Sequence, residues 1–229
     1  MTEDEPDTDE EFETGGESEN DFESERDELA DALATRPNVT ERVADAIRAV
    51  PRHEFVPVEH RDAAYDDRPL PIGEGQTVSA PHVVAIIASE LDLREGDRVL
   101  EIGTGCGYHA AVTAELVGAE HVFSVEYLED LAEKARENLE RAGYGGVSVR
   151  QGDGHDGWPE HAPYDAAYLT CAASEFPDTV VEQVRDGGRL VGPIGDVSQR
   201  LVRAEKNKDG GLVESDEGPV RFVRMQGGE

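Results

Sequence analysis

Short apolar runs alternate with segments of helical periodicity from residue 98 onward, and few folds accommodate such a pattern. Five runs have the length and composition of buried strands: RVLEIG, HVFSVEY, VSVRQGD, YDAAYLT and GRLVGPIG. Three segments between them have a helical period: HAAVTAELVG, LEDLAEKARENLERAG and PDTVVEQVRD. Alternating strands and helices form βαβ units whose parallel sheet is covered on both faces. We therefore predict an α/β fold with a Rossmann-like, doubly wound and mostly parallel sheet.

The regions on either side of this pattern predict further strands near the C-terminal end and helices near the N-terminal end. Near the C-terminal end, RLVRAEKN and VRFVRMQ flank the turn KDGGLVESDEG and predict an antiparallel strand pair. Near the N-terminal end, DELADALATR and VTERVADAIRAV predict two amphipathic helices, and residues 81–93 predict a third with Pro81 in its first turn. We expect one domain over residues 29–229, with an N-terminal helical segment and loop at 29–97 and a core at 98–229.

The N-terminal segment is set apart by its charge. Residues 1–28 contain 15 acidic residues against one basic residue, Arg26, and almost no apolar side chains. Such a segment buries too little surface to offset the entropy lost on ordering. We predict a disordered acidic tail over residues 1–28; an acidic arm that binds a partner is the functional alternative.

The rest of the chain is also acidic, and the formal net charge of the whole chain is -31. Lysine occurs only three times, at Lys134, Lys206 and Lys208. An acidic surface with little lysine predicts a halophilic-type protein, because concentrated salt screens the repulsion between its charges. Without a basic patch, nucleic acid is not an expected partner.

Other classes of site and location are disfavoured by simple features of the composition. The two cysteines form no disulfide framework, and the seven histidines lack ligand spacing, so we expect no metal site. The sequence has no apolar run of transmembrane length and no signal-peptide pattern. We expect a soluble cytoplasmic protein, without membrane association, that acts as a monomer.

The motif with the most chemical content is VLEIGTGCGYHAA, Val99 to Ala111. A strand runs into three closely spaced glycines, and a helix follows, which lets a ligand approach the backbone and the helix N-terminus. Glu126 ends the next strand, about 20 residues further on, where a carboxylate meets ribose hydroxyls. This arrangement fits a dinucleotide or S-adenosylmethionine, and a glycine turn without a ligand is the structural alternative.

The spacing and charge of the loop separate the two cofactors. A dinucleotide fingerprint requires G-x-G-x-x-G, but Tyr108 stands at its last position. Glu101 would oppose a pyrophosphate but suits a cationic amino-acid group or a sulfonium. Asp153 follows the third strand and belongs to the same rim of the sheet, although it could serve only a turn. Together these acids favour S-adenosylmethionine.

Four ordered motifs resemble those of the protein-L-isoaspartate O-methyltransferases: PLPIGEGQTVSAPH, LEIGTGCGYHAAVTAEL, GDGHDGWPEHAPYDAAYLT and VRDGGRLVGPIG. The resemblance extends from about Val50 to Met225. Many S-adenosylmethionine enzymes share the glycine loop, whereas QTVSAPH and GWPEHAPYDA point to this family in particular. The resemblance implies methyl transfer from S-adenosylmethionine to isoaspartyl residues of damaged proteins, which begins their repair.

The resemblance also assigns roles to individual positions. The loop QTVSAPH would cover the cofactor, with Ser79 as the active-site serine that meets the isoaspartyl carboxylate. Glu126 would hold the ribose, and the pair Asp153 and Gly154 would hold the adenine. The full set of implied cofactor-binding positions is Thr77, Glu101, Gly103, Gly105, Gly107, Glu126, Asp153 and Gly154.

Some readings stay open at this point. By residue chemistry alone, Ser79 could instead cap the helix that follows it. Ser174 and Glu175 replace a small-residue run that ends in proline in the family, and Arg224 stands where a proline is usual. These departures, expected to border the substrate site, allow a divergent methyltransferase with another carboxylate or a small-molecule substrate. A cofactor-binding module without catalysis is the alternative from a different class.

Overall fold

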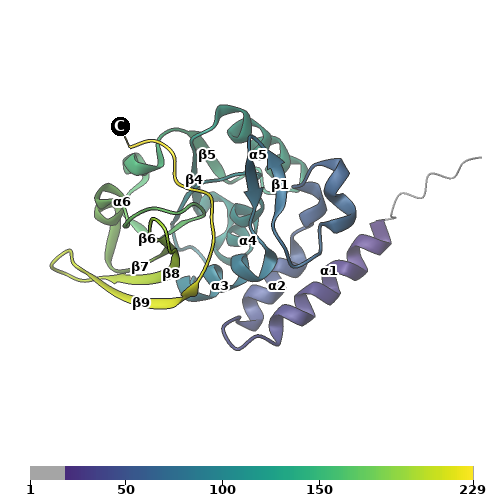
Figure 1. Ribbon diagram of the computed structural model, residues 1–229, viewed down its shortest axis with the longest axis horizontal. Helices are drawn as coiled ribbons and strands as arrows, with labels where there is room; N and C mark the ends of the chain where they lie inside the picture. Colours follow the sequence, from purple (N-terminus) through teal and green to yellow (C-terminus); the bar gives the residue numbers. More distant parts are fainter. Residues whose placement is uncertain (1–18, 229) are drawn as a thin grey trace, which may run out of the picture.

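A seven-stranded sheet runs through the centre of the molecule (Figure 1). The computed structural model describes residues 19–228. The strand order is β5-β4-β3-β6-β7-β8-β9; the first five strands are parallel, and β7, β8 and β9 pair antiparallel. Their bounds are β3 Val99–Ile102, β4 Val122–Glu126, β5 Ser148–Gln151, β6 Tyr164–Leu169, β7 Val184–Ile194, β8 Arg200–Lys206 and β9 Leu212–Pro219. The predicted α/β fold class is confirmed.

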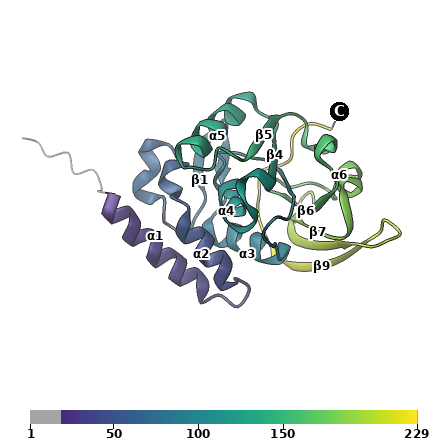
Figure 2. The same ribbon diagram turned by 180° about the vertical axis from the view of Figure 1, so that it is seen from behind.

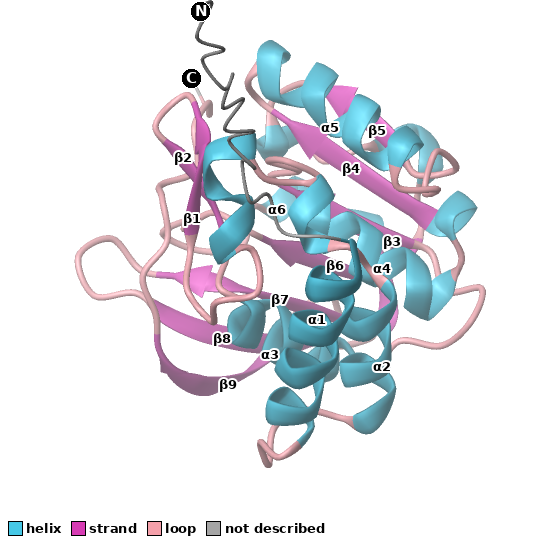
Figure 3. Cartoon of the chain, turned by 90° about the vertical axis from the view of Figure 1, so that its right-hand side faces the viewer, coloured by secondary structure: helices cyan, strands magenta, loops and turns pink. Residues whose placement is uncertain are grey.

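Helices cover both faces of this sheet. One apolar core draws side chains from α2 Glu41–Ala49, α3 Pro81–Leu91, α4 Tyr108–Val117 and α5 Glu129–Arg141. The core on the other face includes α6 Asp178–Gln183. Figure 3 shows α1 Glu19–Ala34, α2 and α4 side by side over one face. Short 3-10 turns lie at Arg52–Glu54, Val58–Ala63, Ala119–His121, Gly154–Asp156 and Pro159–His161.

The central strands have the burial that their unbroken apolar runs predict. Every residue of β3 and β4 is buried, as expected for parallel strands covered on both faces. From β3 the chain adds β4 and β5 on one side, and β6 and β7 on the other. Such a reversal opens a crevice at the carboxyl ends of the strands beside it. The fold therefore places a binding site beyond the ends of β3, β4 and β6.

The proline-rich stretch before α3 contains a small hairpin, where its turn-rich sequence predicts a loop. Strands β1 Leu70–Gly73 and β2 Gln76–Val78 pair antiparallel. Glu74 and Gly75 connect them with positive φ angles of 51° and 69°, which is typical of tight hairpin turns. The hairpin fixes the segment that leads from β2 to Pro81.

The second strand of the C-terminal pair lies earlier than predicted, and the expected strand at VRFVRMQ is wrong. The turn after β8 is short, because the Asn207 N–H already donates to the Gly211 carbonyl at 2.8 Å. β9 is an edge strand that pairs through its backbone, so its acidic sequence LVESDEGP needs no apolar alternation. Residues 220–228, here termed the C-terminal strap, instead cross the carboxyl ends of the strands and form two hydrogen bonds with Ala172.

The predicted tail boundary at residue 28 is wrong, because α1 begins at Glu19 and makes residues 19–28 helical. The Phe22 side chain is 8% exposed and stacks on the His53 ring with centroids 4.3 Å apart. Arg48 of α2 forms salt bridges with Asp27 and Asp31 at 3.3 Å and 2.7 Å. The aromatic contact, the paired charges and the buried side chains of Leu29 and Leu33 thus anchor α1, which runs beside α2 in Figure 2. The rest of the predicted tail, residues 1–18, lies outside the described residues.

We expect the substitution Phe22→Ala to lower the free energy of unfolding by about 3 kcal/mol, because it removes a buried aromatic side chain and leaves a cavity beside His53. The measurement is urea denaturation followed by circular dichroism. Glu23→Ala, on the exposed side of the same helix, is the matched control. Equal stability of the two variants would show that burial of the Phe22 side chain contributes nothing to the stability of the folded domain.

Candidate active site

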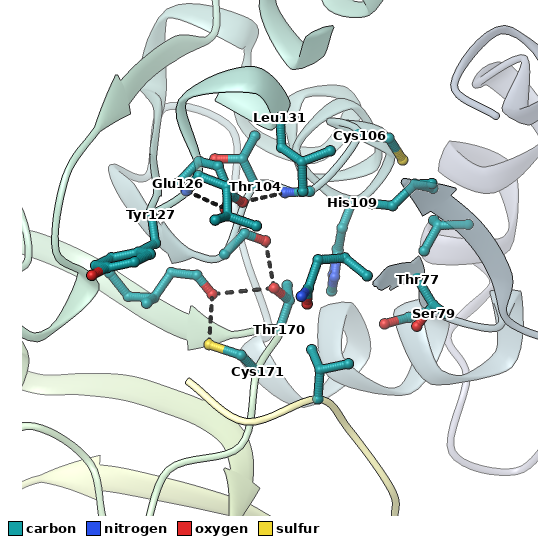
Figure 4. A pocket seen from close by; sticks show the side chains of 18 of the residues that line it. Thr77, Ser79, Thr104, Cys106, His109, Glu126, Tyr127, Leu131, Thr170 and Cys171 are labelled. Carbon is teal, nitrogen blue, oxygen red and sulfur yellow. Dashed lines mark hydrogen bonds between the residues drawn. The ribbon is translucent and has the colours of Figure 1, made fainter. Parts of the chain in front are cut away.

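A cavity lies at the carboxyl ends of β3, β4 and β6, where the sheet topology places it (Figure 4). Its walls come from the loop after β2, the glycine loop after β3, the ends of β4 and β6, and the C-terminal strap. The lining includes Thr77, Ser79, Gly103, Gly105, Glu126 and Gly154 of the predicted site residues. The cavity therefore brings together predicted site residues that are as many as 77 positions apart in the sequence.

The glycine loop has the backbone conformation that its glycines allow. Gly103 and Gly107 have φ angles of 97° and 91°, which side chains disfavour. A Cβ at Gly103 would also overlap the hydroxyl of Thr170, which donates to the Gly103 carbonyl. Gly107 does not line the cavity; it immediately precedes α4 and packs against Leu139.

Glu126 links the glycine loop to the end of β4. Its two carboxylate oxygens accept hydrogen bonds from the Gly105 N–H at 2.8 Å and the Leu128 N–H at 3.0 Å. Burial raises the pKa of Glu126, although these backbone donors act in the opposite direction. A carboxylate oxygen can accept more than one hydrogen bond, so Glu126 keeps acceptor capacity on the cavity side.

Glu101, like Gly107 and Asp153, is a predicted cofactor residue that does not line the cavity. It is fully buried within β3 and lies in register with Ser124 of β4 and Tyr168 of β6. Both hydroxyls donate to its carboxyl group, at 2.5 Å and 2.9 Å. Burial raises the pKa of Glu101 to about 8. Cross-strand pairing therefore directs this side chain into the sheet's own hydrogen-bond network.

Ser79 and Thr77 stand where the cavity meets a neighbouring groove. The groove is lined by both residues and by Thr170, Pro69, His82, Val83 and the segment Pro219–Val223. Ser79 does not cap α3, whose N-cap is Ala80 without a side-chain hydrogen bond. The Ser79 hydroxyl makes no hydrogen bond to any residue within 19–228, whereas its carbonyl accepts one from the buried Arg52 at 3.1 Å. The segment is thus held through its backbone, and the hydroxyl stays available.

Asp153 and Gly154 take different positions. Asp153 does not line the cavity; it accepts hydrogen bonds from the His155 N–H at 2.9 Å and from the Gly228 N–H of the C-terminal strap at 2.7 Å. Desolvation favours a higher pKa for Asp153, but these donors outweigh it and hold the pKa below its usual value. Gly154 does line the cavity, and a Cβ there would lie 2.9 Å from Met225 Cε.

Several lining residues were missed by sequence reasoning. They are His109 on α4, Thr170 and Cys171 after β6, Tyr127 after β4, and Val223, Met225 and Gln226 of the strap. Burial raises the pKa of Cys106 to about 11 and that of Cys171 to about 12, so both thiols stay protonated at neutral pH. The one signal available in the sequence was His109, a polar side chain in a helix that is otherwise apolar on this turn.

The departures at Ser174 and Glu175 lie elsewhere. Both residues line a separate hollow on the outer side of the strap, not the cavity or the groove beside Ser79. The expectation that these two residues border the substrate site stays a prediction, and their hollow shares Arg224 and Met225 with the cavity. Arg224 does line the cavity wall, and its guanidinium pairs with Asp196 at 3.3 Å.

Comparison with known proteins places the chain in a family. Residues 24–229 match the family model described as protein-L-isoaspartate(D-aspartate) O-methyltransferase. The chain belongs to this family. Protein-L-isoaspartate O-methyltransferase 2 of Archaeoglobus fulgidus is 51% identical over 208 residues, which cover 90% of this chain and 95% of that protein. The Methanothrix thermoacetophila enzyme of the same name is 56% identical over 175 residues, 76% of this chain and 83% of that protein.

Solved structures agree with the fold of this family member. A protein-L-isoaspartate O-methyltransferase superposes with a TM-score of 0.81 at 34% identity, covering 88% of this chain and 66% of that chain. A Plasmodium falciparum structure described as a β-aspartate methyltransferase in complex with S-adenosyl-L-homocysteine gives a TM-score of 0.76 at 24% identity. It covers 88% of this chain and 98% of that chain, and supports the fold alone.

The raised pKa of Glu101 predicts a specific pH dependence of stability. Its contribution is fully present below its ordinary value near 4.5 and is lost as the pH rises to about 8. Relative to Glu101→Gln, which stays neutral, the unmodified protein should lose roughly 1.4 kcal/mol of unfolding free energy per pH unit between pH 5 and 8.

Urea denaturation at half-unit pH steps measures this difference. Glu133→Gln, which removes an exposed carboxylate on α5, should run parallel to the unmodified protein. If the unfolding free energy of Glu101→Gln also changed with pH in parallel with that of the unmodified protein, Glu101 would be ionised in the folded state throughout this range.

Proposed function

We propose that this family member transfers a methyl group from S-adenosylmethionine to the free carboxylate of L-isoaspartyl residues in damaged proteins, which starts repair through a succinimide. The observation that carries the proposal is the position of the Ser79 hydroxyl. It has no hydrogen-bond partner among the described residues and stands where the cavity opens into the groove. A cofactor in the cavity and a peptide in the groove would therefore meet at this hydroxyl.

The residues of the cavity fit S-adenosylmethionine. Glu126 retains acceptor capacity for ribose hydroxyls, and the site beside Gly154 is too narrow for any side chain. Gly103 has no side chain, so its backbone at the end of β3 lies directly at the cavity. When bound, the cofactor supplies an electrophilic methyl group on a sulfonium. A shift of the strap would free an oxygen of Asp153, which now accepts from Gly228, for a base amino group.

The protein's own groups need only to align the substrate carboxylate and exclude water from it. An isoaspartyl carboxylate has an ordinary pKa of roughly 3.5 and is already an anion at neutral pH, so no general base is required. A hydroxyl such as that of Ser79 can orient this anion without stabilising it as strongly as a lysine would. The protonated thiols of Cys106 and Cys171 offer no competing nucleophile.

Two alternatives are weighed against this proposal. A different carboxylate or small-molecule substrate was favoured by Ser174 and Glu175, but these side chains lie outside the groove. A cofactor-binding module without catalysis would not need a free hydroxyl at the junction of cavity and groove. A cytoplasmic location, a monomeric state and the absence of nucleic-acid binding stay predictions. Within residues 19–228, no helix is long and apolar enough to cross a membrane.

The proposal is tested by methyl transfer from labelled S-adenosylmethionine to an isoaspartyl peptide, with its aspartyl twin as the substrate control. We expect transfer to the isoaspartyl peptide only. Ser79→Ala should lower kcat/KM about 10- to 100-fold, because it removes a hydrogen bond to a charged group. Ser174→Ala, the same change at an exposed site outside the groove, should leave kcat/KM unchanged.

The outcomes separate the three functions. Equal methylation of both peptides would contradict isoaspartyl recognition and favour another carboxylate substrate. Binding of S-adenosylhomocysteine without transfer to either peptide would favour the module. A Ser174→Ala variant that loses activity while Ser79→Ala retains it would move the substrate site to the outer side of the strap.

We also propose that the acidic surface is of the halophilic type, which means that the protein is more stable in concentrated salt. Residues 29–229 still hold 37 acidic against 20 basic residues, and self-repulsion at low salt should destabilise the compact state. We expect the melting temperature to rise between 0.1 M and 2 M KCl, because the Debye length shortens from about 10 Å to about 3 Å or less. Calorimetry in KCl measures it, and a melting temperature that falls with added KCl contradicts this surface assignment.

A further inference from the structure

His109 is a buried polar residue that the proposed reaction has not used. It is the second residue of α4 and lines the cavity, and its side chain is 5% exposed. Neither ring nitrogen has a hydrogen-bond partner within residues 19–228. In Figure 4, His109 lies on the side of Thr77 and Ser79, away from Tyr127. An imidazole with both nitrogens unpaired thus belongs to the wall of the site.

Such an arrangement costs stability unless a ligand completes it. Buried polar side chains nearly always have a hydrogen-bond partner. An unpaired one has lost its hydrogen bonds to water and gained none to the protein. The ring is also held in place, because it packs on the Tyr168 ring with centroids 4.4 Å apart. Tyr168 is fixed in turn by hydrogen bonds with Thr113 and Glu101. The ring of His109 is therefore held in a defined orientation in the wall of the cavity.

The imidazole is neutral in this environment, since burial lowers the pKa of His109 to about 3. A neutral imidazole has one N–H donor and one acceptor nitrogen. It can therefore donate to an anionic oxygen without the strong attraction of a full positive charge.

The charges around the cavity indicate which anion needs this donor. Arg224 is the one cationic side chain among the described lining residues, and Asp196 already pairs with it. The groove beside Ser79 does not include His109, which places the ring with the cofactor rather than with the peptide. Glu126 and Gly154 mark the nucleoside end of the cavity in the proposed function. The amino-acid end, with its α-carboxylate, would then lie toward His109.

We propose that the neutral imidazole of His109 donates a hydrogen bond to the α-carboxylate at the amino-acid end of the bound cofactor. This assignment rests on the proposed cofactor, but not on methyl transfer to any particular substrate. His109 is a binding residue in it and takes no part in proton transfer.

Calorimetric titration with two ligands tests the assignment. S-adenosylhomocysteine carries the amino-acid end, and 5′-methylthioadenosine lacks it. His109→Leu should weaken S-adenosylhomocysteine about 10- to 100-fold and change 5′-methylthioadenosine less than about 2-fold, as expected for loss of a hydrogen bond to a charged group. His109→Gln, which keeps an N–H donor, should recover most of the affinity. His121→Leu, the same change in a turn outside the cavity, should change neither.

Thermal unfolding of the free proteins supplies an independent readout. His109→Leu should melt at or above the temperature of the unmodified protein, because it replaces an unpaired polar group with an apolar one. Equal weakening of both ligands, or of neither, overturns the assignment. Unchanged S-adenosylhomocysteine affinity with a raised KM for the isoaspartyl peptide also overturns it and moves the imidazole to the substrate. A failure of peptide methylation with ligand discrimination intact would count against the proposed function alone.

Discussion

The cover over the candidate active site, formed by the segments around Ala64, Arg68 and Ser79, depends on one fully buried cation, Arg52. Its guanidinium donates to the carbonyls of Ala64 at 2.7 Å, Ser79 at 3.1 Å and Arg68 at 3.2 Å, and lies 4.9 Å from the centre of the Tyr108 ring. Burial lowers its pKa, but the guanidinium is a strong enough base to stay charged. Three chain segments of the cover are thus joined to each other and to the start of α4. The position of Ser79 follows from this junction.

Several ionisable groups at the candidate site favour their neutral forms, although the protein as a whole is strongly acidic. Glu101 is held toward its protonated form, His109 is neutral, and the cavity thiols keep their protons. Burial causes all of these shifts, because an apolar environment disfavours ionised groups. The cavity therefore offers hydroxyls, backbone amides and a neutral ring, with Glu126 and Arg224 as its charged lining residues.

The parts of this structure that local sequence determines were predictable, and the parts that depend on distant contacts were not. Apolar runs and glycines predicted the parallel strands, the glycine loop and the place of Glu126. β9 escaped prediction because an edge strand pairs through its backbone and needs no apolar pattern. The helical structure of residues 19–28 was not predicted, because it depends on the contact between the Phe22 and His53 rings, which are distant in the sequence. The orientation of Glu101 follows from strand register, which the sequence of β3 alone does not contain.

The edge at β9 bears on how copies of the protein behave at high concentration. A free strand edge can pair with the edge of another molecule and begin aggregation. Here Glu214, Asp216 and Glu217 line that edge, but in 1 M salt their repulsion extends only about 3 Å. The irregular register beside Leu201 and the proline at the end of β9 do not depend on charge. The backbone shape of this edge can thus keep neighbouring molecules from pairing where salt has removed the electrostatic barrier.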